Sequence, residues 1–413
     1  MIYVFVFLYC IFNNAIYSPD SASYLNATIY RSPGYPIFVR VFSIIFQQYF
    51  DFFIVSAQCL LGLFAVHTLV IKTSKVLHLS FVLKLVFVLL LVFPFFPPLW
   101  VANNICSEGL SYPLYLFFLA FSLDFLFNNT SKSLLILSAS YILLVLTRGQ
   151  FIVLTIIFTA IYILKNKHIV LKPTIIKNVI VLLLLPFAVS LLDKTYHKAK
   201  DGLFIATPFT YINASASALY VSKASDKMLL KNTDDQLIFD DCHAFISENK
   251  WLMSSKERSS FSDYYKHFHD NLGRICNYTL HDRGTAYYVN KNQTIVEARY
   301  HIEKSSKRML PVLIKSNFNN WIKLFYSNLV HGFKSQIILF LLIGTFIISF
   351  IKTLKSTNNN TLIIFYLTSL ILSNALIVAF ASHSIMRYLF YNYSLFFIIA
   401  ILIYKYIRDV KNN

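Results

Sequence analysis

Residues 361–381 read TLIIFYLTSLILSNALIVAFA, a run without a single charged side chain. A helix needs roughly 20 mostly apolar residues to cross the hydrocarbon layer of a membrane, and this run has that length. Only 14% of the residues in the whole chain are charged, whereas a soluble domain carries about 25%. The run and the composition together predict a protein embedded in a membrane.

Further apolar runs of similar character occur on both sides of this one, and each is expected to form a helix. They occupy residues 2–17, 52–71, 81–101, 109–127, 133–147, 149–164, 175–192, 336–351 and 386–404. The sequence therefore predicts an all-α polytopic membrane protein with about ten transmembrane helices.

The run 34–49 is harder to interpret, because it is short, begins among prolines and is interrupted by Arg40. If it does not span, the short lysine-rich loops all fall on one side of the membrane. Those loops carry Lys72, Lys75, Lys84, Lys132, Lys165, Lys167, Lys172, Lys177, Lys352 and Lys355. Short cytoplasmic loops are enriched in Lys and Arg. We therefore predict a surface or re-entrant helix here, and the net charge of +18 reflects membrane topology, not nucleic-acid binding.

With this topology, the long polar region 193–335 lies outside the cytoplasm, as does the loop 17–51. We predict an N-terminal transmembrane domain (1–192) that includes the first outer loop (17–51), an inserted extracytoplasmic domain (193–335) and C-terminal transmembrane helices (336–413). Cys242 and Cys276 both fall in the inserted domain, and a disulfide between them is left open. Richness in Ile, Lys, Asn, Phe and Tyr favours a bacterial inner membrane, with the site facing the periplasm or exterior.

Ionisable side chains gather at the predicted outer helix ends and are almost absent from mid-membrane positions. Ion-coupled transporters need such groups near the midplane, so transport is disfavoured. The outer groups are expected to form a site at the level of the lipid headgroups, although any one of them could instead be a helix cap or a lipid contact. They are Asp20, Arg31, Arg40, Glu108, Arg148, His383 and Arg387.

Several short motifs at these positions resemble one enzyme family. SPDSASY (18–24) and RSPGYP (31–36) look like the first outer loop of the glycosyltransferase C superfamily, closest to protein mannosyltransferases and the aminoarabinose transferase. SEGL (107–110), LTRG (146–149) and RYL (387–389) resemble later motifs of that family. Gly109 and Gly149 depart from the pattern, because proline is usual at both places.

The resemblance implies a membrane glycosyltransferase that moves a sugar from a polyprenyl-phosphate carrier to a glycan, lipid or protein acceptor, with inversion at the anomeric carbon. It implies Asp20 as the catalytic base. Donor-phosphate contacts would come from Arg387, Arg31 and Arg148, and substrate contacts from Tyr24, Tyr35, Glu108, His383 and Tyr388. Asp20 stands where some members carry two acids, so no metal ligand is assigned and a divalent cation as cofactor is left open.

Two other functions remain as alternatives. A polysaccharide polymerase or O-antigen ligase would use basic residues of the large outer region, for which Arg274, Arg283, Arg299 and His301 are available. A non-enzymatic lipid flippase or scaffold would tolerate the loss of Asp20, whereas the transferase should not.

Overall fold

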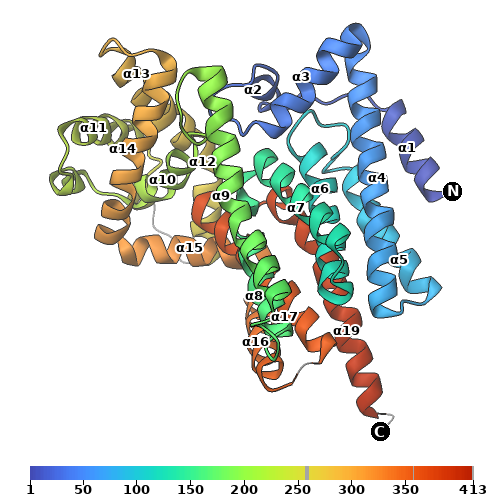
Figure 1. Ribbon diagram of the computed structural model, residues 1–413. Coiled ribbons are helices and arrows are strands. Elements are labelled where there is room, and N and C mark those ends of the chain that lie inside the picture. The colour runs from blue at the N-terminus through green and yellow to red at the C-terminus, as the bar shows by residue number, and fades with distance from the viewer. Residues whose placement is uncertain (256–259, 357, 412–413) are drawn as a thin grey trace. The chain divides into compact units, whose positions relative to one another are not determined.

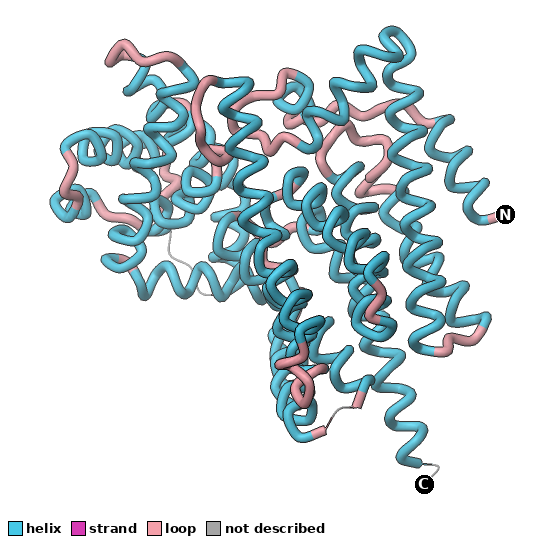
Figure 2. Tube along the Cα trace, viewed as in Figure 1, coloured by secondary structure: helices cyan, strands magenta, loops and turns pink. Residues whose placement is uncertain are grey.

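The computed structural model describes residues 1–255, 260–356 and 358–411, and it consists of helices joined by loops (Figure 2). Within these ranges the only β-type pairing is an isolated bridge between Ile16 and Asn104, so they contain no sheet. The predicted all-α fold is confirmed.

Contacts divide the chain into two compact units. The first comprises Met1–Tyr196, Leu342–Asn374 and Phe390–Asn413, and the second comprises His197–Leu341 and Ala375–Leu389. The second unit therefore includes residues 375–389, which the sequence assigned to the C-terminal membrane helices.

The helices of the first unit are labelled in Figure 1. They are α1 (Ile2–Phe12), α2 (Ser21–Leu25), α3 (Gly34–Phe46), η1 (Gln47–Tyr49), α4 (Phe50–Leu77), α5 (Phe81–Val92), η2 (Phe93–Phe95), α6 (Glu108–Asn128), α7 (Ser131–Thr147), η3 (Gly149–Phe151), α8 (Leu154–Lys165), η7 (Phe390–Asn392) and α19 (Tyr393–Lys411). The chain changes unit within α9 (Pro173–Asp201), α16 (Gln336–Lys355) and α17 (Asn359–Ala381).

The second unit is built from shorter helices. They are α10 (Thr210–Val221), η4 (Ala224–Leu229), α11 (Thr233–Glu248), η5 (Met253–Ser255), α12 (Phe261–Ile275), the π-helix η6 (Cys276–His281), α13 (Arg283–Val289), α14 (Ile295–Ser316), α15 (Phe318–Phe333) and α18 (Met386–Leu389).

Local sequence signals explain several helix ends. The hydroxyl of Ser80 accepts from the first turn of α5, and that of Thr130 does the same for α7, so each satisfies an orphan backbone N–H. His78 and Asn129 adopt left-handed conformations that end α4 and α6. α6 then packs between α4 and α7 and is buried along most of its length, which makes it the central helix of the first unit.

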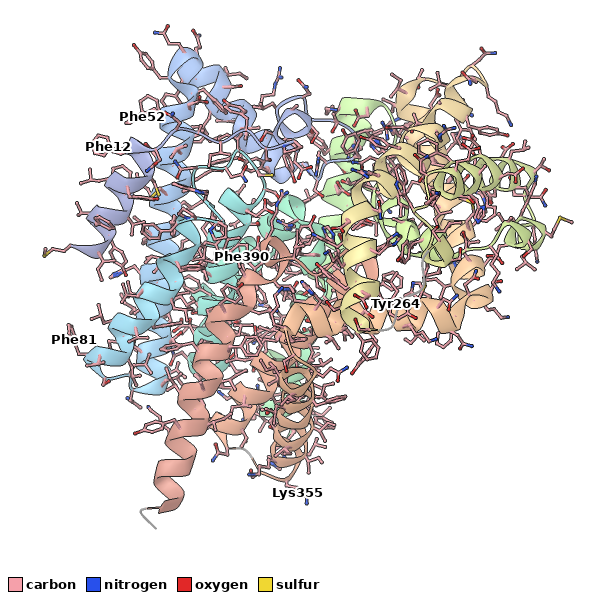
Figure 3. All side chains as sticks on the ribbon, turned by 180° about the vertical axis from the view of Figure 1, so that it is seen from behind. Phe12, Phe52, Phe81, Tyr264, Lys355 and Phe390 are labelled. Carbon is pink, nitrogen blue, oxygen red and sulfur yellow. The ribbon has the colours of Figure 1, made fainter. Side chains whose placement is uncertain are left out.

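Among the described residues, six helical segments are long and apolar enough to cross a membrane. They are the helical segment Gly34–Leu77, then Glu108–Asn128, Pro173–Asp201, Gln336–Lys355, Asn359–Ala381 and Met386–Lys405. Large apolar side chains such as Phe12, Phe52 and Phe81 are exposed on the first unit and point outward (Figure 3). This surface indicates a multi-pass membrane protein, because lipid tails would cover it.

The other four predicted membrane segments are also helical but shorter: Ile2–Phe12, Phe81–Phe95, Ser131–Thr147 and Gly149–Lys165. A helix of 12 residues such as α5 is about 18 Å long, which is less than the roughly 30 Å of the hydrocarbon layer. The predicted run 81–101 is cut short because Pro94, Pro97 and Pro98 interrupt its second half.

The difficult run 34–49 forms a helix of its own, α3. It is separated from α4 at Gln47, whose φ of 41° breaks the helical path. α3 buries Tyr35 and exposes Ile37 and Ile44. Such an exposed apolar face is typical of a helix that lies at a membrane surface.

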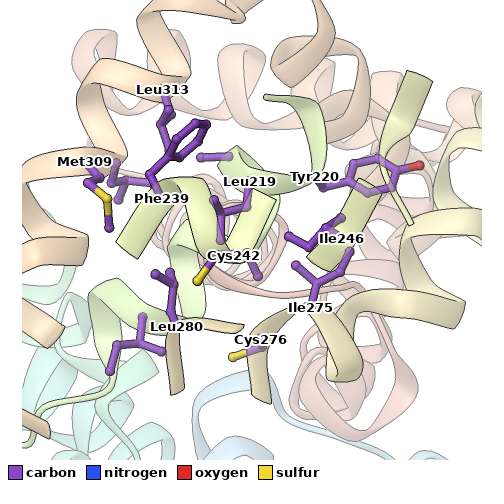
Figure 4. Packing of buried hydrophobic residues seen from close by; sticks show 14 of the residues in the cluster. Leu219, Tyr220, Phe239, Cys242, Ile246, Ile275, Cys276, Leu280, Met309 and Leu313 are labelled. Atoms are coloured by element: carbon purple, nitrogen blue, oxygen red, sulfur yellow. The ribbon is translucent and has the colours of Figure 1, made fainter. Parts of the chain in front are cut away.

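The core of the second unit contains both cysteines that the sequence considered as a disulfide pair (Figure 4). Cys242 and Cys276 are free thiols buried among aliphatic side chains, so the disulfide is not formed. Burial raises the pKa of the Cys276 thiol to about 12 and keeps it uncharged. Both residues therefore act as small apolar core residues.

Candidate functional site

The loop region that follows α1 folds around the Asp20 carboxylate. Asp20 precedes α2, and Arg31 reaches back over that helix so that its Nη2 lies 2.7 Å from Asp20 Oδ1. Arg31 also donates through Nε to Ser23 Oγ at 2.8 Å and through Nη1 to Tyr24 Oη at 3.3 Å. Burial disfavours the charged guanidinium, but Tyr24 and Asp20 outweigh it and raise the pKa of Arg31.

A second acid–arginine pair joins two later helix ends. Glu108 begins α6, Arg148 follows α7, and the distance from Arg148 Nη1 to Glu108 Oε1 is 2.6 Å. Arg148 Nε donates to Gln150 Oε1 at 2.8 Å, and its Nη1 lies 3.5 Å from Ser107 Oγ. The carboxylate at the helix N-terminus is also favoured by the positive end of the α6 dipole.

Tyr24 connects the two pairs, because its hydroxyl donates to Ser107 Oγ at 3.1 Å. The pairs differ in exposure. The Asp20 side chain is 35% exposed and Arg31 17%, whereas Glu108 is 6% and Arg148 12% exposed. Asp20 is therefore the group of this network most open to a ligand, and the Glu108–Arg148 pair forms its buried support.

Sequence reasoning missed Gln58, which supports the network from α4. The Gln58 side chain is buried, accepts from Tyr35 Oη at 2.9 Å and donates from Nε2 to the Ala102 carbonyl at 2.7 Å. Tyr35 in turn lies edge-to-face against Tyr24, with ring centroids 5.1 Å apart. The signal was available, since Gln58 is a lone amide inside the apolar run 52–71.

Gln58 also accounts for a glycine where the family resemblance would place proline. A Cβ added at Gly109 would lie 2.0 Å from Gln58 Oε1 and 2.4 Å from its Cδ. Because both ends of the Gln58 amide are hydrogen-bonded, the side chain cannot yield without losing a partner. Gly34 is similarly tight, because a Cβ added there would lie 2.9 Å from the backbone N of Thr147.

We predict that Gly109→Ala lowers the thermal unfolding temperature of the purified protein by several degrees, since overpacking costs about 1–3 kcal/mol. Gly149→Ala is the matched control, because nothing lies within 4 Å of its added Cβ. The double variant Gly109→Ala/Gln58→Ala should recover part of the loss. Equal melting of the two single variants would show that the close contact with Gln58 is not real.

The network extends from Arg148 into α17 and η7. Gln150 Nε2 donates to Asn374 Oδ1 at 3.1 Å, and Asn374 Nδ2 donates to Asn392 Oδ1 at 3.2 Å. Segments far apart in the sequence thus meet through amide side chains, of which Asn374 and Asn392 are buried. Six of the predicted site residues, namely Asp20, Tyr24, Arg31, Tyr35, Glu108 and Arg148, lie in this one connected region of the first unit.

The other three predicted residues, His383, Arg387 and Tyr388, belong to the second unit. His383 Nδ1 lies 2.9 Å from His269 Nδ1 on α12, so one of the two rings donates a hydrogen bond to the other. Arg387 and Tyr388 fall in the short helix α18 and are half-buried. The His383 and Tyr388 ring centroids are 6.2 Å apart.

A third histidine joins this cluster. The His331 ring stacks on Tyr265 with centroids 3.5 Å apart, and Lys334 Nζ lies 2.8 Å from His331 Nε2. Burial, with Lys334 and His269 nearby, lowers the pKa of His331 to about 4. Burial and the neighbouring histidines lower the pKa of His383 to about 4 as well.

These depressed pKa values predict an acid-labile second unit. A histidine has a pKa of about 6.5 when unfolded, so between 6.5 and about 4 the unfolded chain binds more protons than the folded one. The stabilisation is complete above pH 6.5 and is lost as the pH falls through that window. We expect the unfolding temperature to drop by several degrees from pH 7.5 to pH 5, and His331→Gln/His383→Gln to flatten the dependence. An unchanged slope in that variant would exclude these histidines as its cause.

The basic residues that a polymerase would require make contacts typical of structural side chains. Arg283 pairs with Asp241 at 2.8 Å, Arg299 donates to the His281 carbonyl at 2.8 Å, and Arg274 lies over the Trp251 ring. His301 stacks near Tyr288, and burial lowers its pKa.

Two features of the described residues bear on ligands. No group of three or more His, Cys, Asp and Glu side chains among them has the geometry of a metal site. A groove of about 420 Å³ runs between α1 and α4, where Tyr3, Phe7, Leu60 and His67 line it. Its walls are almost wholly apolar, and none of the residues that line it belongs to the Asp20 network.

No protein-family model, curated protein or solved structure matches the chain.

Proposed function

We propose that the chain is a membrane glycosyltransferase that moves a sugar from a polyprenyl-phosphate carrier to an acceptor hydroxyl. The observation that carries the proposal is the Asp20–Arg31 pair: a partly exposed carboxylate held 2.7 Å from a guanidinium at a polar edge of a membrane-embedded helical unit. In such a transfer the acceptor hydroxyl loses a proton and the leaving phosphate gains negative charge. The carboxylate can accept that proton, and the neighbouring guanidinium can stabilise that negative charge.

The reaction needs a base and an anion stabiliser. The acceptor hydroxyl would give its proton to the Asp20 carboxylate while its oxygen attacks the anomeric carbon. The bond from that carbon to the phosphate oxygen breaks, and the polyprenyl phosphate leaves with the electron pair. Arg31 uses three of its five N–H donors on Asp20, Ser23 and Tyr24, so others are available for that phosphate. A single displacement inverts the anomeric centre.

The remaining parts of the proposal follow from the predicted topology. We infer about ten membrane passages, six from the long helices and the others from the shorter apolar ones, with the network on the extracytoplasmic side of a bacterial inner membrane. Glu108, Arg148 and Tyr35 would position the loop, and Tyr24 would line the sugar site. His383 and Tyr388 stay as candidate substrate contacts, and Arg387 stays as a candidate contact to the donor phosphate. Whether the acceptor is a glycan, a lipid or a protein is left to experiment.

The deciding experiment follows the donor. Purified full-length protein in liposomes is given radiolabelled undecaprenyl-phosphate sugars together with a cell-envelope extract as acceptor. We expect free undecaprenyl phosphate to appear in step with labelled product. Transbilayer movement of intact donor without bond cleavage would instead identify a flippase, and consumption of diphosphate-linked oligosaccharides alone would identify a polymerase or ligase.

A further inference from the structure

One side of helix α15 packs into the core of the second unit. Trp321 and Leu324 are buried in the unit's core, and Trp321 Nε1 donates to Ser217 Oγ at 3.2 Å. α15 also packs along α12. The inner face of this helix is therefore fixed by its own domain.

The outer face of α15 carries the opposite pattern. Phe318 is 53% exposed and Ile322, one turn later, is 38% exposed. Lys323 on α15 and Lys315 in the last turn of α14 are also exposed. Large apolar residues flanked by lysines are the signature of a helix that lies in a membrane–water interface, with its rings among the acyl chains and its ammonium groups near lipid phosphates.

The chain itself brings this face to a membrane. α15 ends at Phe333, Lys334 turns the backbone with φ 59°, and α16 begins at Gln336. α16 is one of the six helices able to span, and its first turns expose Ile337 and Phe340. Because two linking residues reach at most about 10 Å, the end of α15 lies within that distance of the point where the chain crosses the bilayer surface.

We propose that the outer face of α15 docks the second unit on the anionic headgroup layer of the bilayer that α16 crosses. Phe318 and Ile322 enter the interface, and Lys315 and Lys323 contact lipid phosphates. The occupant is the lipid surface, not a second protein, because the lysine flanks complement anionic lipid and the helix leads straight into a span. This docking does not depend on the transfer reaction.

Site-directed spin labels test the proposal on the full-length chain. Ile322→Cys and Phe318→Cys carry a nitroxide in phosphatidylcholine liposomes with and without phosphatidylglycerol. The five native cysteines are buried, so the introduced thiol is the accessible one. Ile295→Cys is the matched control: it is also apolar, is 65% exposed and begins α14, about 30 Å along that helix from Ser316.

We expect oxygen to reach the labels at 318 and 322 better than a water-soluble nickel complex does, and the reverse at 295. Adding Lys323→Glu to the Phe318→Cys variant should move its label toward water in anionic liposomes, whereas Lys304→Glu should not. If the nickel complex reached the labels at 318 and 322 as well as it reaches the label at 295, the proposal would be overturned. Labels at 318 and 322 that neither oxygen nor the nickel complex reaches would also overturn the proposal, because they would indicate a protein partner. If the accessibility of these labels did not change with anionic lipid, the lipid surface would be excluded as the occupant.

Discussion

Asp20→Asn is expected to lower sugar transfer by about 100- to 10,000-fold, the usual contribution of a general base. The amide keeps the size of the side chain but cannot accept the acceptor's proton. Since Asp20 is partly exposed and precedes only the short helix α2, the variant should fold. Donor turnover by purified protein, with thermal unfolding measured on the same sample, separates the two effects.

Asp51→Asn is the matched control for this change. Asp51 lies in the first turn of α4, where it accepts from the Tyr17 hydroxyl outside the Asp20 network. We expect it to retain turnover. Arg31→Lys should also impair turnover, because a lysine cannot donate to Asp20, Ser23 and Tyr24 at the same time. We expect a lower kcat with a smaller change in KM. Full activity of Asp20→Asn would remove Asp20 as the proposed base and direct attention to the arginines of the 193–335 region.

The sequence predicts the gathering of the polar residues better than their pairing. Asp20, Glu108 and Arg148 all lie at the ends of apolar runs, so counting the predicted membrane crossings is enough to place them on one side. The number of crossings does not show which acid pairs with which arginine. Asp20 pairs within its own loop and Glu108 pairs across to the end of α7, and both choices depend on how α2, α6 and α7 pack.

Two features of the structure had weaker signals in the sequence. Gln58 supports Tyr35 and Ala102 from mid-helix, and nothing in an apolar run shows which neighbours one amide will meet. The boundary of the second unit inside α17 was also hidden, because residues 361–381 form one uncharged run while those after Asn374 pack with the second unit. Hydropathy reports the solvent that a helix prefers, not the helices it touches.

The Glu108–Arg148 pair is expected to be a folding determinant, in contrast to Asp20. Arg148→Met leaves a buried carboxylate without its cation, and Glu108→Gln leaves a buried guanidinium without its anion. Removing one partner of such a pair costs about 3–5 kcal/mol, while replacing both is often close to neutral. We expect each single variant to unfold at a clearly lower temperature and to accumulate poorly in membranes.

The double variant Glu108→Gln/Arg148→Met decides what the pair does. If the pair only supports the fold, the double variant regains both its unfolding temperature and its turnover. If the pair also sets the position of Ser107 and Tyr24, stability returns but turnover stays low. Ser107 accepts from both Tyr24 and Arg148, so the loss of Arg148 leaves Ser107, and with it Tyr24, less firmly placed. We expect the second outcome, with KM raised more than kcat is lowered, since Tyr24 would contact the sugar and not the transferred proton. A double variant as unstable as the singles would instead show that the two residues have further essential partners.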